Sequence, residues 1–196
     1  MKKTTVRGAL PFILTVAAIS LPLSGVFDTA TIFLDQMQWY VGAVVVVAIV
    51  LIGALFDMLG VAAAAARETP FHAMASKKVF GARRAIVIVR NAEKVSSICS
   101  DVVGDIAGVL SGAGALAVSV QLGDALRLEG WQRELVTIIL TAMVTSITVG
   151  AKALGKTLAI QSPTPIILVA AKIFDTIWIF GRGKDQRRKA KTKTRH

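Results

Sequence analysis

Five charged residues next to uncharged stretches are the candidates for chemistry in this chain. Asp101 and Asp105 stand one helical turn apart and precede a stretch of eighteen uncharged residues. Asp57 ends a second such stretch, and Lys152 and Lys156, also one turn apart, follow a third. Because an unpaired charge is costly to bury, each carboxylate needs a cation beside it. The carboxylates are candidate ligands for a hard divalent ion such as Mg²⁺, and the lysines are candidate ion-pair partners.

Glycines that follow the two aspartates add a packing signal. Each residue of an α-helix turns about 100°, so a narrow stripe of side chains shares one face. Gly104, Gly108 and Gly112 form two consecutive G-x-x-x-G steps, which let the backbone of another helix approach closely. Two simpler interpretations therefore stand beside a cation site: a helix contact without chemistry, and aspartates solvated at the headgroup level of a membrane. The stripe comprises Ser97, Asp101, Gly104, Asp105, Gly108 and Gly112.

Residues for other kinds of chemistry are few. Cys99 is the only cysteine, which excludes an internal disulfide and a multi-cysteine metal site. His72 and His196 are the only histidines, which argues against a histidine-ligated metal centre. No nucleophile–histidine–acid arrangement and no phosphate-binding loop stands in the sequence. The chain is therefore predicted not to be an enzyme and to carry no cofactor, apart from Mg²⁺ as a ligand.

Composition and long apolar runs predict an all-α integral membrane protein. Hydrophobic residues make up 54% of the chain and the mean hydropathy is +0.65, more than a water-exposed surface tolerates. About twenty apolar residues cross a bilayer as a helix, so we expect about four transmembrane helices. The first run follows a basic start and is also compatible with a signal peptide, although it lacks a clean A-x-A site. The four runs are 8–27, 36–56, 106–123 and 135–151.

Two further segments suit the membrane surface. Residues 68–95 mix basic and apolar side chains too finely to span, and they predict short juxtamembrane helices. Residues 164–183 are apolar, with Lys172, Asp175 and Thr176 on one helical side, which favours a helix lying in the interface. A fifth span over the same residues is the alternative, and it would leave the two termini on opposite sides of the membrane.

The distribution of basic residues predicts the orientation. If the N-terminus lies inside, Arg127 and Arg133 are the only two of the 23 basic residues that fall in outer loops. This positive-inside asymmetry predicts a multi-pass protein of the cell membrane with both termini in the cytoplasm. The basic tail, 183–196, is expected to face anionic lipids rather than nucleic acid.

Three short stretches resemble a known family. LFDMLGVA (55–62), SDVVGDI (100–106) and AKALGKTLA (151–159) stand where the transmembrane domain of the CNNM/CorC magnesium transporters, the DUF21 domain, carries F-F-S-G-S-E-x-A, G-N-N-x-x-N and G-E-x-x-P-K-T-L-A. The closing KTLA matches outright. The resemblance covers 36–182, leaves 1–35 as an extra N-terminal transmembrane helix with an outer loop, and implies a homodimer. We expect the protein to lack the pair of cytoplasmic CBS domains typical of the family.

The residues at the family's cation-facing positions differ from the motif. The serine position falls on Asp57, and the two asparagine positions fall on Asp101 and Asp105. The glutamate position falls on Lys152 and the proline on Gly155. Carboxylates suit Mg²⁺, whereas a lysine cannot ligate the ion and repels it.

Two functions therefore remain open from the sequence. One is a divergent CNNM-like protein for divalent cation (Mg²⁺) transport or sensing, with the three aspartates as metal ligands. The other is a non-transporting membrane scaffold, in which Lys152 and Lys156 turn the former cation site into an internal Asp–Lys salt bridge.

Overall fold

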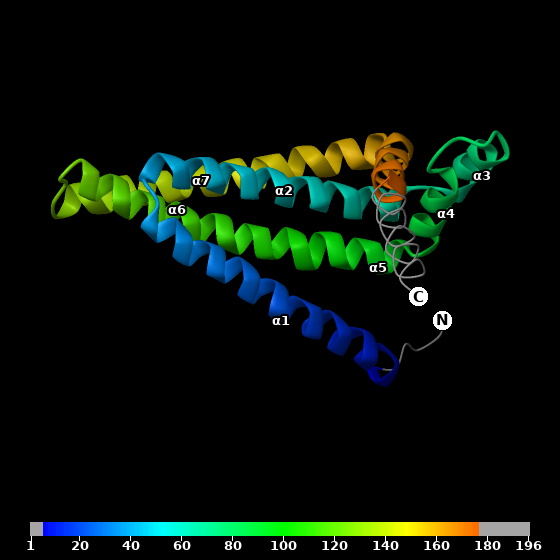
Figure 1. Ribbon diagram of the computed structural model, residues 1–196, viewed down its shortest axis with the longest axis horizontal. Helices are drawn as coiled ribbons and strands as arrows, with labels where there is room; N and C mark the ends of the chain where they lie inside the picture. The colour runs from blue at the N-terminus through cyan, green and yellow to red at the C-terminus, as the bar shows by residue number, and fades with distance from the viewer. Residues whose placement is uncertain (1–5, 177–196) are drawn as a thin grey trace, which may run out of the picture.

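The computed structural model describes residues 6–176, in which every element is a helix and no strand occurs. Three long helices lie side by side, short helices gather at one end of them, and the first helix leans away (Figure 1). The helices are α1 (Val6–Gln36), α2 (Trp39–Ala65), α3 (Glu68–Ser76), α4 (Ala82–Arg90), α5 (Ala92–Ser96), the π-helix η1 (Ser97–Gly104), α6 (Asp105–Ala125), α7 (Trp131–Gln161), and a further helix over residues 163–176.

Three helices of the described chain are long and apolar enough to cross a membrane. They are α2, the continuous helix Ala92–Ala125 formed by α5, η1 and α6, and α7, with 27, 34 and 31 residues. Each contains most or all of one of the predicted runs, and a helix satisfies its own backbone hydrogen bonds, as a segment that crosses a membrane must. The predicted all-helical class is confirmed, and so are three helices of spanning length.

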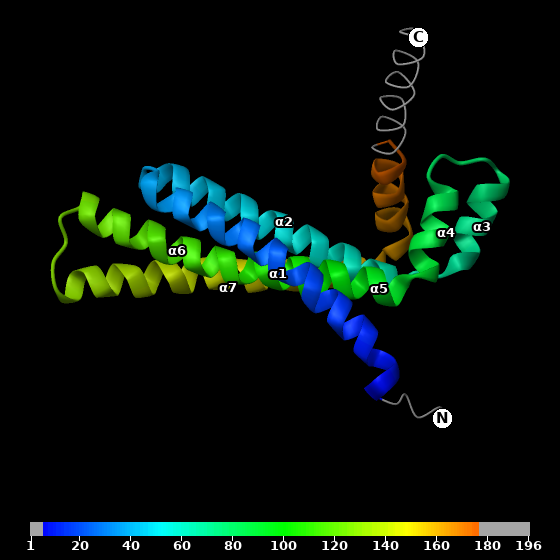
Figure 2. The same cartoon turned by 60° about the horizontal axis from the view of Figure 1, so that its bottom comes forward.

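The first predicted span also forms a helix, but its geometry differs from the other three. Helix α1 packs on α6 near its C-terminal end and diverges from the bundle toward its N-terminus (Figures 1 and 2). Its described apolar part, Ile13–Gly25, is shorter than the spans above. Whether it forms a fourth span stays a prediction.

Short helices form between the second and third predicted spans, as the sequence predicts, and their place at a membrane surface stays a prediction. Helices α3 and α4 pack against each other as a hairpin. Gly81 closes the hairpin with φ +85°, a conformation that favours glycine, and a Cβ there would lie 2.9 Å from the Lys172 side chain. The hairpin therefore backs directly onto the last described helix.

That last helix, residues 163–176, runs across the end of the bundle instead of alongside it (Figure 2). We call it the crossing helix. Its direction agrees with the predicted interface helix better than with a fifth span. The predicted continuation to residue 183 and the basic tail lie outside the described residues.

The tightest core lies where the crossing helix, α3 and α4 meet the ends of α2 and α7. Its fully buried members are mostly alanines, whose small side chains let five helices converge. Further along the bundle, a Cβ on Gly53 would lie 2.6 Å from the Ala107 Cβ, so α2 and α6 approach closely there. The core residues are Ala62, Ala63, Phe71, Ala85, Ala159, Ile167 and Ala171.

Candidate functional site

Four charged side chains from three helices meet in the bundle, and we call them the charge cluster. The Nζ of Lys156 on α7 lies 3.4 Å from Oδ2 of Asp57 on α2. The Nζ of Lys152, one turn earlier on α7, lies 3.7 Å from Oδ1 of Asp105 at the start of α6. The cluster thus consists of two acid–lysine pairs, one linking α7 to α2 and the other linking α7 to α6.

Two glycines of α6 and the π-helix lie next to the Lys152 ammonium. A Cβ on Gly108 would lie 3.5 Å from the Lys152 Nζ, so the lysine runs over the bare backbone of α6. The ammonium also donates a hydrogen bond of 2.9 Å to the carbonyl oxygen of Gly104. An added Cβ on Gly104 or Gly108 would meet its nearest neighbours at 3.4 Å or more, an ordinary contact distance, and a Cβ on Gly112 would meet nothing within 4 Å, so a close approach that needs these glycines stays a prediction.

Asp57 is the most buried charge of the cluster. Its side chain is 4% exposed, while that of Lys156 is 52% exposed. Among the described residues its Oδ2 atom receives no hydrogen bond, although Lys156 lies within ion-pair distance. A buried carboxylate oxygen with one partly exposed lysine as its neighbour is costly, which makes Asp57 the residue most sensitive to changes around it.

The backbone beside Asp57 is fixed by a second contact. Ser100 on η1 donates a hydrogen bond of 3.3 Å to the carbonyl oxygen of Asp57. This approach depends on Gly60, because a Cβ there would lie 2.4 Å from the Ser100 Oγ. Helix α2 and the π-helix η1 are thus packed with almost no space between their backbones.

The π-helix changes which residues share a face. Over 97–104 the hydrogen bonds connect residues five apart instead of four, so side chains no longer turn by the regular 100°. Asp101 lies on the exposed side of this segment, and within residues 6–176 it forms no ion pair. The predicted stripe assumed a regular α-helix over these residues; Asp101 and Asp105 are both exposed, and of the two only Asp105 lies within ion-pair distance of a lysine among the described residues.

The predicted metal ligands are consequently divided. Asp57 and Asp105 each lie within ion-pair distance of a lysine, and Asp101 has no ion pair among the described residues. Within the part of the chain that the structure describes, no three His, Cys, Asp or Glu side chains gather closely enough to hold a metal ion.

A second group of ion pairs, which the sequence did not reveal, lies at the short-helix end. The Nε of Arg84 on α4 contacts Oδ1 of Asp175 on the crossing helix at 2.5 Å, a pair separated by 91 residues. On α3, Glu68 accepts hydrogen bonds from Arg90 at 3.0 Å and from His72 at 3.2 Å. The Arg90 hydrogen bond, followed by that of His72, holds the pKa of Glu68 below its usual value.

No protein-family model, curated protein or solved structure matches this chain. The resemblance to the CNNM/CorC transmembrane domain therefore stays an interpretation of the sequence.

Proposed function

We propose that this protein is a non-transporting membrane scaffold whose charge cluster is an internal pair of salt bridges. The observation that carries the proposal is the position of Lys156 and Lys152, 3.4 and 3.7 Å from the carboxylates of Asp57 and Asp105. Each lysine occupies the place where a cation would neutralise a carboxylate. The two pairs join α2, α6 and α7, so the charges hold the bundle together instead of forming a path through it.

Helix lengths support a position of the cluster at the inner edge of a bilayer. Asp57 follows Trp39 by 18 residues and Lys152 follows Trp131 by 21 residues, which is about 27 and 32 Å of helix. The hydrocarbon core is about 30 Å thick, and tryptophans favour its boundaries. With the tryptophans at the outer boundary, the cluster reaches the inner one, and the short helices and the termini lie on the cytoplasmic side of the cell membrane.

Electrostatics argues against a divalent ion in the same place. At an effective dielectric constant of about 20, two unit charges 4 Å apart interact by about 4 kcal/mol. Mg²⁺ at that distance from the Lys156 ammonium would meet roughly twice that repulsion. To bind, Mg²⁺ would have to displace the Lys156 ammonium from the Asp57 carboxylate. When the ion left, the lysine would pair with the carboxylate again.

A divergent CNNM-like role in Mg²⁺ transport or sensing is the second candidate. It is favoured by one observation, the buried Oδ2 of Asp57 that receives no hydrogen bond among the described residues. In this candidate Asp57, Asp101 and Asp105 would ligate the ion after the lysines move away. A homodimer, as the resemblance implies, belongs to both candidates. Only 6% of the most apolar stretch of α7 is buried, so the outward face of this helix offers a surface for a second copy.

Reconstituted vesicles distinguish the two candidates. The full-length protein is inserted into liposomes that contain a Mg²⁺-sensitive dye, and Mg²⁺ is added outside with and without a membrane potential. The scaffold proposal expects the same dye signal as in protein-free liposomes. Mg²⁺ uptake by the wild type that Asp57→Asn abolishes would contradict it and establish the transport candidate.

A further inference from the structure

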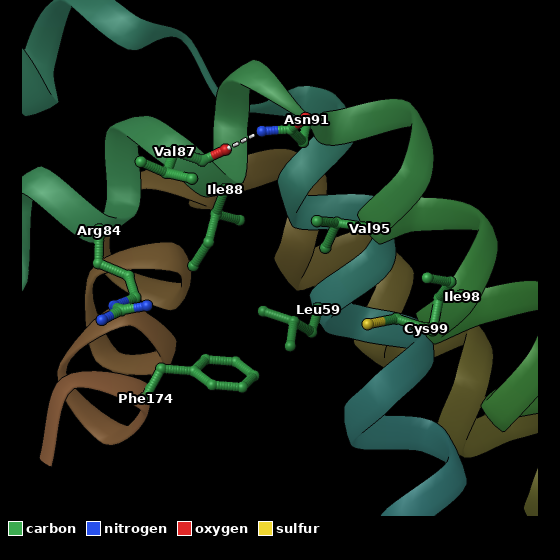
Figure 3. A pocket seen from close by; sticks show the side chains of 9 residues that line it. All are labelled: Leu59, Arg84, Val87, Ile88, Asn91, Val95, Ile98, Cys99 and Phe174. Atoms are coloured by element: carbon green, nitrogen blue, oxygen red, sulfur yellow. Dashed lines mark hydrogen bonds between the residues drawn. The ribbon is translucent and has the colours of Figure 1, made fainter. Parts of the chain in front are cut away.

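A shallow groove of about 620 Å³ lies along the outward face of α7, and every described residue that lines it belongs to this one helix. Another hollow of the molecule, under the crossing helix, is covered by the protein itself. Phe174 of the crossing helix faces Leu59 of α2 across that mostly apolar cavity (Figure 3). The α7 groove, in contrast, has no facing helix among the described residues. It is lined by Ile138, Thr141, Ala142, Thr145, Ser146 and Val149.

Two hydroxyl groups in this groove have no hydrogen-bond partner within residues 6–176. Thr137, Thr141 and Thr148 of the same helix each donate a hydrogen bond to a backbone carbonyl oxygen of the preceding turn, at 3.0, 2.7 and 2.7 Å. Thr145 and Ser146 make no such bond, and both residues are exposed. Their hydroxyls can therefore bond to a partner that covers the groove.

The depth of these hydroxyls makes lipid a poor partner for them. Thr145 follows Trp131 by 14 residues, which is about 21 Å of helix. With Trp131 at the outer boundary of a hydrocarbon core about 30 Å thick, both hydroxyls lie inside the core. Acyl chains offer no hydrogen-bond donor or acceptor, and a hydroxyl without a partner in an apolar medium costs free energy. A protein surface with polar groups at the same depth removes that cost.

A second copy of this chain carries the polar groups that the groove requires. A hydroxyl is both a donor and an acceptor, so a patch of hydroxyls can bond to the same patch across a two-fold axis. Two copies in one membrane have the same orientation, which sets α7 parallel to α7 and each groove residue near its own counterpart. Ala142 and Ser146, one turn apart, have small side chains, which let two helix backbones approach each other.

We propose that α7 pairs with α7 of a second copy through this groove, and that Thr145 and Ser146 form hydrogen bonds between the copies inside the membrane. The homodimer named above rests on a resemblance, whereas the groove and its hydroxyls argue for one independently and assign its contact surface. The inference rests on the proposed membrane placement and holds for either candidate function. The salt bridges of the charge cluster lie within each copy.

Disulfide cross-linking of the full-length protein in native membranes tests the contact. Thr145→Cys and Ile147→Cys are each made in a Cys99→Ala background and oxidised with copper phenanthroline. The two positions are both exposed, point about 200° apart on the helix and differ in depth by only about 3 Å. We expect several-fold more disulfide dimer from Thr145→Cys than from Ile147→Cys. Equal yields from the two variants, or no dimer from Thr145→Cys, would overturn the inference.

Removal of the hydroxyls tests the hydrogen bonds without introducing a cysteine. Energy transfer between labelled copies in lipid vesicles, followed as lipid dilutes the protein, gives the dissociation constant of the dimer. Thr145→Val combined with Ser146→Ala should raise this constant several-fold. Thr141→Val is the matched control and should change it little, because Thr141 also lines the groove but already bonds to its own helix. An unchanged constant for the double variant, or an equal effect of Thr141→Val, would overturn the proposed hydrogen bonds.

The reactivity of Ile147→Cys distinguishes this inference from the membrane proposal. If only the interface is wrong, Ile147→Cys stays unreactive toward a membrane-impermeant maleimide in opened cells, and Thr145→Cys forms no disulfide dimer. If the maleimide modifies Ile147→Cys in opened cells, the membrane placement fails, and the argument for the α7 contact fails with it.

Discussion

The Nζ of Lys152 lies 2.9 Å from the carbonyl oxygen of Gly104, the last residue of the π-helix. At Gly104 the backbone hydrogen bonding changes from the π to the α pattern. The Lys152 ammonium donates a hydrogen bond to the carbonyl oxygen at this junction. Its other contact, to Asp105, is 3.7 Å long and involves a carboxylate that is 74% exposed. Lys152 therefore holds α7 to α6 mainly through the backbone of the π-helix.

This relationship predicts that substitutions of Lys152 and of Asp105 have unequal effects on stability. Lys152→Met should cost about 1–3 kcal/mol, because it removes a charge-assisted hydrogen bond inside the bundle. Asp105→Asn should cost less than about 1 kcal/mol, since its carboxylate is largely exposed. Asp101→Asn is the control and should stay within about 0.5 kcal/mol of the wild type. Denaturant unfolding in detergent micelles measures all three, and a larger loss for Asp101→Asn than for Lys152→Met would contradict the assignment.

A close-contact glycine gives the second prediction. Gly60→Ala places a Cβ 2.4 Å from the Ser100 Oγ and 3.1 Å from the Ser96 carbonyl oxygen, so α2 and η1 must separate. We expect a loss of about 1–3 kcal/mol, as for other overpacked sites. Gly150→Ala is the matched control, because a Cβ there meets nothing within 4 Å and alanine favours a helix by about 1 kcal/mol over glycine. A thermal melt in which both variants behave alike would remove the packing argument.

Orientation is checked by labelling single cysteines in intact cells. In a Cys99→Ala background, Glu129→Cys in the α6–α7 turn should react with a membrane-impermeant maleimide. Lys77→Cys in the α3–α4 turn should react only after the cells are opened, because the basic residues predict that this end is cytoplasmic. The reverse pattern would invert the topology and place the charge cluster at the outer boundary.

The pH dependence of Glu68 gives a further prediction. Its pKa is lowered in the folded protein, chiefly by the hydrogen bond from Arg90, so the ionised form stabilises the hairpin. That contribution is complete above the ordinary glutamate value of 4.5 and is lost as the pH falls through the lower folded pKa. The difference in melting temperature between the wild type and Glu68→Gln should therefore shrink between about pH 7 and about pH 3. A difference that grows on acidification would show that Glu68 does not contribute in this way.

Uncharged runs predicted the long helices because hydrocarbon tolerates few charges and forces the backbone to bond within each segment. The positions of Asp57, Lys152 and Lys156 at the ends of their uncharged runs also predicted that these residues lie at a similar level along the bundle. The π-helix was not foreseen, since no side-chain spacing encodes a change from α to π hydrogen bonding. Asp101 and Asp105 are both exposed, and of the two only Asp105 lies within ion-pair distance of a lysine among the described residues. The Arg84–Asp175 pair was missed because 91 residues separate its members.

A double-mutant cycle on Asp57 and Lys156, with and without millimolar Mg²⁺, tests the salt-bridge account most directly. Unfolding of the full-length protein in micelles is compared among the wild type, Lys156→Met, Asp57→Asn and the double variant. Lys156→Met should lose about 2–4 kcal/mol, less than the roughly 3–5 kcal/mol of a fully buried pair, because Lys156 is half exposed. Adding Asp57→Asn should recover most of that loss, and Mg²⁺ should change none of the four stabilities. If the losses of the two single variants add up in the double variant, the salt-bridge account is contradicted. Stabilisation of the wild type by Mg²⁺ would also contradict it and would favour a cation site.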